Sequence, residues 1–167
     1  MASALPAFRD MTIIDNQPVY LFKKIQLLVS DLHIRFSLTH PDLFNFNDIT
    51  SLPIFSDNVI PTMLHHLHIL PLSLPAAATP QQIQLIQDLK EDLRTGRETT
   101  RERSYILRAA AVDTCEEIVR TARRMGELPE WLRGMKSVDV DGYLWKVAKV
   151  GQLKDIVRFS DPNTVFF

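Results

Sequence analysis

The chain has 167 residues, of which 46% are apolar, and this is enough to fill the core of one ordinary folded domain. Its 19 basic and 20 acidic residues give a net charge of −1, which excludes a general basic surface that binds nucleic acid regardless of sequence. The single cysteine, Cys115, excludes a disulfide within the chain.

The sequence shows no segment that suggests export or membrane insertion. Its start, MASALPAFRD, lacks the charged and apolar regions of a signal peptide. No apolar run approaches the ~20 residues that span a bilayer. We therefore expect a cytoplasmic protein that does not bind membranes.

The first predicted element is an amphipathic helix in the segment PVYLFKKIQLLVSDLHIRF, after Asp15 and Asn16, either of which could cap it. Apolar residues recur there every three or four positions, as on one face of a helix. These residues are Leu21, Ile25, Leu28, Leu32 and Phe36. Residues 37–57 contain several prolines, asparagines and aspartates, so they are predicted to form an irregular, partly buried connection.

The stretch LPIFSDNVIPTML places Asp57 between two apolar runs. Aspartate is among the best side chains for accepting the free N–H groups at the start of a helix, and Pro61 suits a first helical turn. Asp57 is therefore predicted to cap a short apolar helix that ends near Pro71. A carboxylate at this position could also serve a pocket, but the local pattern alone favours the cap.

Three further helices are predicted in the second half of the chain. Their predicted bounds are Thr79 to Leu93 with Gly96 as the closing residue, about Arg101 to Met125, and Ser137 to Gly151. The two phenylalanines at the end of the chain are expected to pack against the core. Because alternating strand patterns are nearly absent, the predicted class is mainly α, with a single helical domain over residues 1–167.

Familiar catalytic and ligand-binding motifs are absent from the sequence. No GxGxxG, P-loop, GxSxG or HExxH pattern occurs, which argues against a bound nucleotide cofactor, a serine nucleophile and a zinc protease site. His65, His66 and His68 are close in sequence, but a metal site would need a further ligand from elsewhere in the fold. Cys115 lies among apolar residues, as an inert core thiol does. We expect no cofactor and no metal ion.

Six blocks of the sequence carry a resemblance to a known family. They are PAFRD, VYLFKKIQLLV, LPIFSDNVIPTMLHHL, ILRAAAVDTCEEIV, VDGYLWKVAK and the terminal VFF. In this order they resemble the queuosine salvage family of queuosine 5′-phosphate N-glycosylases, particularly its fungal members. The resemblance implies hydrolysis of the N-glycosidic bond of queuosine 5′-phosphate, which frees queuine for insertion into tRNA. It also implies a helical fold similar to that of DNA glycosylases, a small-molecule nucleotide as substrate, and no direct binding of nucleic acid.

The resemblance also implies roles for individual residues. Queuine is a 7-deazaguanine, so protonation at N7 is unavailable and catalysis depends more on stabilising a cationic sugar, which a carboxylate does. The family pattern implies that Asp57 is catalytic and that Asp141 accepts hydrogen bonds from the donor edge of the base. The other residues expected to bind substrate are Phe55, Asn58, Gly142, Lys146 and Arg108. From charge alone, and not from the resemblance, either Lys23 or Arg108 is expected to meet the 5′-phosphate. Trp145 is expected to be structural.

The family resemblance also bears on the extent of the domain. Family members carry a comparable length of chain before the PAFRD block, whereas Met1 lies almost directly before that block here. We therefore expect residues 1–167 to be the C-terminal portion of a queuosine salvage domain, with an N-terminal half as a partner. The alternative is a non-catalytic helical fragment that binds a partner supplying the missing N-terminal half.

Overall fold

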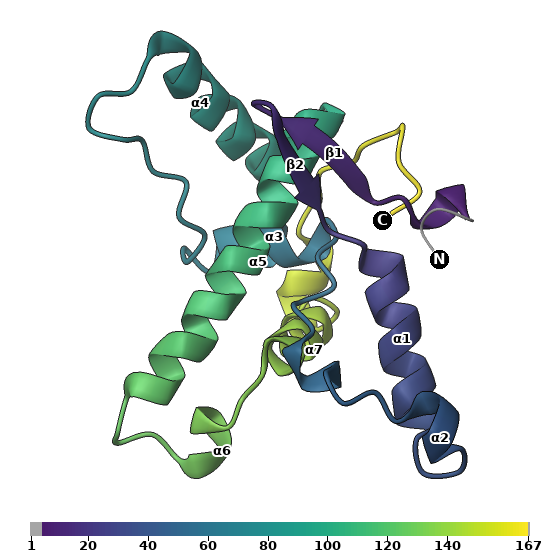
Figure 1. The fold of residues 1–167 in the computed structure, drawn as a ribbon. Helices are drawn as coiled ribbons and strands as arrows, with labels where there is room; N and C mark the ends of the chain where they lie inside the picture. Colours follow the sequence, from purple (N-terminus) through teal and green to yellow (C-terminus); the bar gives the residue numbers. More distant parts are fainter. Residues whose placement is uncertain (1–4, 167) are drawn as a thin grey trace.

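A computed structural model describes residues 5–166, which form seven α-helices and one two-stranded antiparallel sheet (Figure 1). The helices are α1 (Lys23–Phe36), α2 (Pro41–Phe44), α3 (Val59–His66), α4 (Pro80–Thr95), α5 (Arg101–Arg124), α6 (Glu130–Arg133) and α7 (Ser137–Val147). The strands are β1 (Met11–Ile14) and β2 (Gln17–Tyr20). The described residues confirm the predicted mainly α class.

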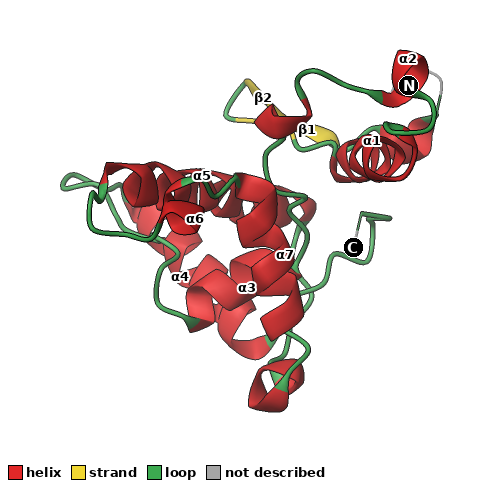
Figure 2. Ribbon diagram, turned by 90° about the horizontal axis from the view of Figure 1, so that it is seen from below, coloured by secondary structure: helices red, strands yellow, loops and turns green. Residues whose placement is uncertain are grey.

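The hydrophobic core lies where α3, α5 and α7 pack on one another, with α4 against α3 (Figure 2). Ala111 and Cys115 of α5 are fully buried, and their small side chains let the neighbouring helices approach closely. Larger core side chains stabilise the fold by about 1.5–3 kcal/mol each when buried. They include Ile60, Met63, Leu64, Leu89, Leu107 and Leu144. The core therefore holds the start of α3 and the middle of α7 at a fixed separation.

The predicted starts of the later helices are confirmed. At the start of α4 the Gln82 N–H donates to Thr79 Oγ1 at 3.3 Å, and the Thr79 N–H donates to Gln82 Oε1 at 2.9 Å. Gly96 follows α4 with a φ of 65°, a left-handed conformation that glycine adopts without steric cost. Helices α5 and α7 begin at Arg101 and Ser137, as predicted.

The N-terminal segment differs from the prediction. Asp15 and Asn16 do not cap a helix; they form the turn between β1 and β2, with φ values of 49° and 59°. Positive φ at both turn residues is required by a tight two-residue hairpin of the I′ type, and Asp and Asn tolerate it better than most residues. Leu21 is buried before the helix, and α1 begins at Lys23. Each strand has four residues, too few to give a clear alternating pattern in the sequence.

Helix α1 lies beside α2 and apart from the core helices (Figures 1 and 2). None of its residues is fully buried, and Ile34 is 74% exposed. The predicted amphipathic helix is therefore present, but the described structure leaves its apolar residues only partly buried. Residues 37–57 form the predicted connection, interrupted by α2 and one short turn of 3-10 helix.

The C-terminal segment folds back onto the molecule. Phe166 is 6% exposed, and the Arg108 guanidinium lies 5.9 Å from the centre of its ring. This confirms the expected packing for Phe166, whereas Phe167 lies outside the described residues. In the part of the chain that the structure describes, no helix is both long and apolar enough to cross a membrane.

Candidate active site

Three segments that are far apart in the sequence meet at a cavity of about 240 Å³. The start of α1, the loop before α3 and the middle of α7 surround it. The residues that line the cavity are Lys23, Leu27, Phe55, Asp141 and Trp145. Charged and aromatic side chains from distant parts of the chain therefore converge on one small space.

Asp57 lies directly behind the residues that line the cavity. Its two carboxylate oxygens accept hydrogen bonds from different partners. Oδ1 accepts the Val59 N–H at 2.7 Å and so caps α3, as predicted. Oδ2 accepts hydrogen bonds from Lys23 Nζ at 3.0 Å and from Trp145 Nε1 at 3.1 Å. Because Asp57 is 2% exposed, the Lys23 ammonium supplies the opposite charge that a buried carboxylate needs. One oxygen thus caps α3, and the other binds two residues that line the cavity.

Asp141 has one buried oxygen, Oδ1, without a hydrogen-bond partner among the described residues. Burial, followed by the negative charge of Asp57, raises the pKa of Asp141 to about 6. The Lys23 ammonium and a hydrogen bond with the Phe55 backbone oppose this rise in pKa. The charge of Asp57 therefore acts on Asp141, and Asp141 can accept a hydrogen bond from a bound ligand.

Aromatic rings complete the cavity. Trp145 is 37% exposed, and its ring is held between the bond to Asp57 and the ammonium of Lys149, which lies 3.6 Å from the ring centroid. Phe55 lines the cavity from the loop before α3. Flat apolar rings beside carboxylates suit a planar heterocycle that carries N–H donors.

Of the residues that the sequence analysis expected at the site, Phe55 and Asp141 line the cavity and Asp57 lies behind it, while their roles stay predictions. Asn58 does not line the cavity: its Nδ2 donates to the Phe159 backbone oxygen at 2.9 Å, which ties the start of α3 to the C-terminal segment.

Gly142 and Lys146 do not line the cavity either, because they lie on the exposed side of α7. Arg108 is 0% exposed, and its Nη1 donates to Asp10 Oδ1 at 2.9 Å. Its Nε donates to the Ser56 backbone oxygen at 2.9 Å. Because its guanidinium has no exposed surface and binds Asp10 and Ser56, Arg108 does not line the cavity, and its contact with the substrate stays a prediction.

The sequence analysis missed the position of Trp145, which was expected to be structural. A usable signal was present: Trp145 follows Asp141 by four residues, and residues four apart share one face of a helix. Lys23 was assigned to a phosphate on charge alone, whereas in the structure it pairs with Asp57. Nothing in the sequence pattern of α1 distinguishes Leu27 from its apolar neighbours.

Other chemical groups are arranged less favourably for catalysis. Within residues 5–166 no group of three or more His, Cys, Asp and Glu side chains is placed to hold a metal ion. Burial raises the pKa of Cys115 to about 12, so its thiol stays protonated and unreactive at neutral pH.

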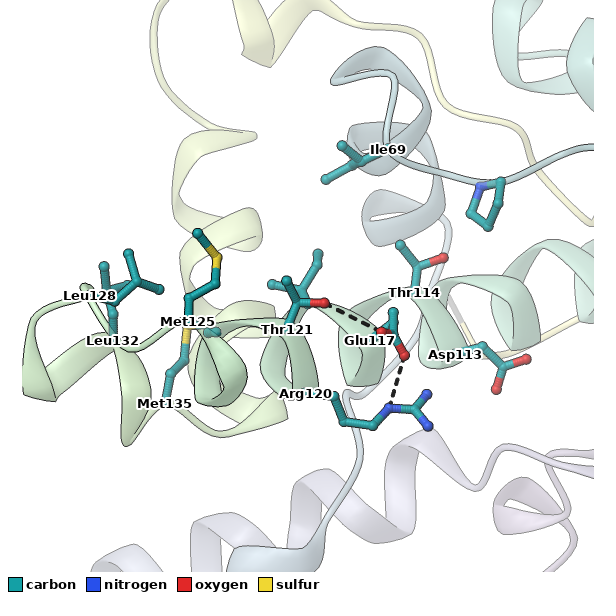
Figure 3. A pocket seen from close by; sticks show the side chains of 13 residues that line it. Ile69, Asp113, Thr114, Glu117, Arg120, Thr121, Met125, Leu128, Leu132 and Met135 are labelled. Atoms are coloured by element: carbon teal, nitrogen blue, oxygen red, sulfur yellow. Dashed lines mark hydrogen bonds and ion pairs between the residues drawn. The ribbon is translucent and has the colours of Figure 1, made fainter.

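A larger cavity of about 660 Å³ runs along α5 and the segment that follows it (Figure 3). Its floor is apolar, with residues such as Met125, Leu132 and Met135. Glu117, at its edge, pairs with Arg120 at 3.1 Å, and both side chains are more than half exposed. A groove with solvated charges at its edge and an apolar floor lacks the converging buried polar groups found beside Asp57.

Comparison with known proteins identifies the family of the chain. The family model described as queuosine salvage protein matches residues 1–167. A relative from Sphaerobacter thermophilus, named queuosine 5′-phosphate N-glycosylase/hydrolase, is 40% identical over 70 residues. These residues make up 42% of this chain and 21% of the relative, so this chain has about half the relative's length. The chain belongs to the queuosine salvage protein family.

Proposed function

We propose that this chain carries the site that hydrolyses the N-glycosidic bond of queuosine 5′-phosphate. In this reaction the bond between C1′ of the sugar and the base nitrogen breaks, water adds to C1′, and the products are queuine and ribose 5-phosphate. The proposal is supported by the family membership and by the name of the relative. The observation that carries it is an aromatic-walled cavity that Asp141 lines, with Asp57 hydrogen-bonded to two further lining residues, Lys23 and Trp145.

In the proposal, Asp57 acts at the sugar. Loss of the base leaves positive charge on C1′ and the ring oxygen, and a fixed carboxylate in a nearly dry site stabilises that charge strongly. Lys23 and Trp145 hold Oδ2 in place before the substrate arrives, so little reorganisation is needed during the reaction.

Asp141 acts at the base in the proposal. The guanine-like edge of queuine presents N1–H and an exocyclic amine, which are two parallel donors, and an ionised carboxylate is a matching pair of acceptors. The unpartnered Oδ1 of Asp141 suits this task, because a ligand donor would remove the free-energy cost of a buried polar atom without a partner. Phe55 and Trp145 would then flank the ring.

The size of the cavity limits what it can hold. Ligand cavities for drug-sized molecules measure about 300–1,000 Å³, whereas this one measures about 240 Å³. We therefore propose that it receives the base, and that the 5′-phosphate lies outside it. An N-terminal half, as the sequence analysis expects, would supply contacts to the remainder of the nucleotide.

The test is to incubate the purified chain with queuosine 5′-phosphate and to measure free queuine by mass spectrometry. Asp57→Asn is expected to lower kcat by about 10²–10³-fold, the loss typical of removing one electrostatic group from a transition state. Asp92→Asn is the matched control, because Asp92 is also a fully buried, ion-paired aspartate but binds Arg97 and Arg103 instead of cavity residues. Equal rates for Asp57→Asn and the wild type would contradict the proposal. No release by a folded wild-type chain would favour the partner-binding fragment instead.

A further inference from the structure

We propose that the buried ion pair between Asp10 and Arg108 is a positioning device that sets the distance between Lys23 and Asp57. Neither residue of the pair lines the cavity. The kinetic consequence of this proposal rests on the proposed function, whereas its structural consequence does not.

Asp10 fixes the start of α1. Its backbone oxygen accepts the N–H groups of Leu21 at 3.0 Å and Phe22 at 3.2 Å, and its Oδ2 accepts the N–H of Lys23 at 3.1 Å. Asp10 therefore accepts hydrogen bonds from three consecutive backbone N–H groups. Phe22, which precedes α1, has a φ of 50° and makes no side-chain cap bond, so Asp10 provides the cap from a distant position in the sequence.

Arg108 connects Asp10 to the loop that carries Asp57. Its Nη1 and Nη2 donate to the two carboxylate oxygens of Asp10, and its Nε donates to the Ser56 backbone oxygen at 2.9 Å. The Ser56 hydroxyl in turn donates to the Arg108 backbone oxygen at 2.9 Å. Ser56, the residue immediately before Asp57, is thus joined to Arg108 of α5 by two hydrogen bonds, one in each direction.

The contacts form a closed loop around the site. Lys23 is bound through its backbone to Asp10, and through its ammonium to Asp57 at 3.0 Å. Asp57 follows Ser56 in the chain. The Ser56 backbone oxygen accepts a hydrogen bond from Arg108, and Arg108 also donates to Asp10, which closes the loop. Since α1 has no fully buried residue, this loop replaces core packing as the anchor that holds Lys23 in place.

The chemistry of the pair fits a geometric role better than a purely stabilising one. A planar guanidinium can meet a carboxylate with two N–H groups and a carbonyl with a third, which a lysine cannot. Both side chains are 0% exposed. Buried ion pairs are often no more stabilising than apolar side chains of similar volume, so the exchange of this pair for apolar residues is a usable test.

The test follows the Trp145 indole, whose N–H donates to Asp57. The ¹⁵N–¹H resonance of this group is recorded in the wild-type chain, in Asp10→Asn, and in the double variant Asp10→Leu with Arg108→Met, which keeps the buried volume apolar. Asp92→Asn again serves as the control for loss of a buried, ion-paired aspartate at a different place. The kcat and KM for queuine release are measured on the same samples.

Asp10→Asn and the double variant are expected to shift the Trp145 resonance and to lower kcat by about 10²-fold with a smaller change in KM, because a displacement of about 1 Å has this effect on a catalytic group. Asp92→Asn is expected to leave both unchanged. The proposal is overturned if a folded Asp10→Asn or double variant keeps the wild-type resonance and kcat. Should the wild-type chain release no queuine, the proposed function fails, and the resonance alone still decides the positioning proposal.

Discussion

At the scale of single residues, Asp57 shows why a local pattern can predict a helix cap without revealing a site. The cap depends on residues within three positions, so the stretch SDNVIP was sufficient to predict it. The partners of Oδ2 lie 34 and 88 residues away, and no local pattern encodes them. The pocket role of Asp57 came from the family resemblance, and it stays a prediction.

For Arg108, the sequence suggested a ligand contact, whereas the structure shows a buried ion pair. Its charge suggested a phosphate contact, yet the sequence contains no sign that Asp10, 98 residues away, would neutralise it. A charged residue on an otherwise apolar helix face is as consistent with a buried ion pair as with a ligand site. The charge of Arg108 alone therefore could not decide between a buried ion pair and a contact with the ligand.

The pH dependence of the reaction tests Asp141. Burial and the charge of Asp57 raise its pKa from 3.8 to about 6, so Asp141 becomes protonated as the pH falls through about 6. Only the ionised carboxylate accepts both donors of the base, so kcat/KM is expected to fall about tenfold per pH unit below that point. In Asp141→Asn this fall near pH 6 is expected to disappear, together with a loss of about 10–100-fold at pH 8.

Asp113→Asn is the control for this pH profile. Asp113 is exposed on α5 and lines the larger cavity along that helix, away from Asp141. It should keep the wild-type profile. A decline near pH 6 that persists in Asp141→Asn would show that another group titrates there.

At the scale of elements, the helices with strong boundary residues were predictable and the hairpin was not. Thr79 and Gly96 act through bonds and backbone angles within one turn of α4, so their effect is visible in the sequence. Asp15 and Asn16 suit both a helix cap and a tight turn, and strands of four residues could not decide between the two.

Gly96 offers a test of the end of α4. An added Cβ would lie 2.6 Å from Val157 Cβ, and the φ of 65° is unfavourable for alanine. Gly96→Ala is therefore expected to lower the free energy of unfolding by about 1–3 kcal/mol, measured by urea denaturation. Gly126→Ala is the control, because nothing lies within 4 Å of its added Cβ, and its effect should be small. Similar losses in both variants would contradict the assigned role of Gly96.

At the scale of the whole molecule, the candidate site is a product of tertiary structure. Lys23 comes from α1, Asp57 from the loop before α3, and Asp141 and Trp145 from α7 (Figure 1). The core that joins α3, α5 and α7 places two of these segments, and the Asp10–Arg108 pair places the third. The helical class could be predicted from periodicity, whereas this convergence depends on packing between residues far apart in the chain.

The most direct test of the account is the titration of the Asp141 carboxyl carbon, followed by ¹³C NMR in the wild-type chain and in Asp57→Asn. The account holds that the two carboxyl groups lie near the same cavity, so the Asp57 charge adds to burial in raising the pKa of Asp141. The wild-type midpoint is expected near pH 6, and Asp57→Asn should move it down toward 3.8. An Asp141 midpoint that stays the same or rises in Asp57→Asn would contradict the convergence on which the proposed site depends.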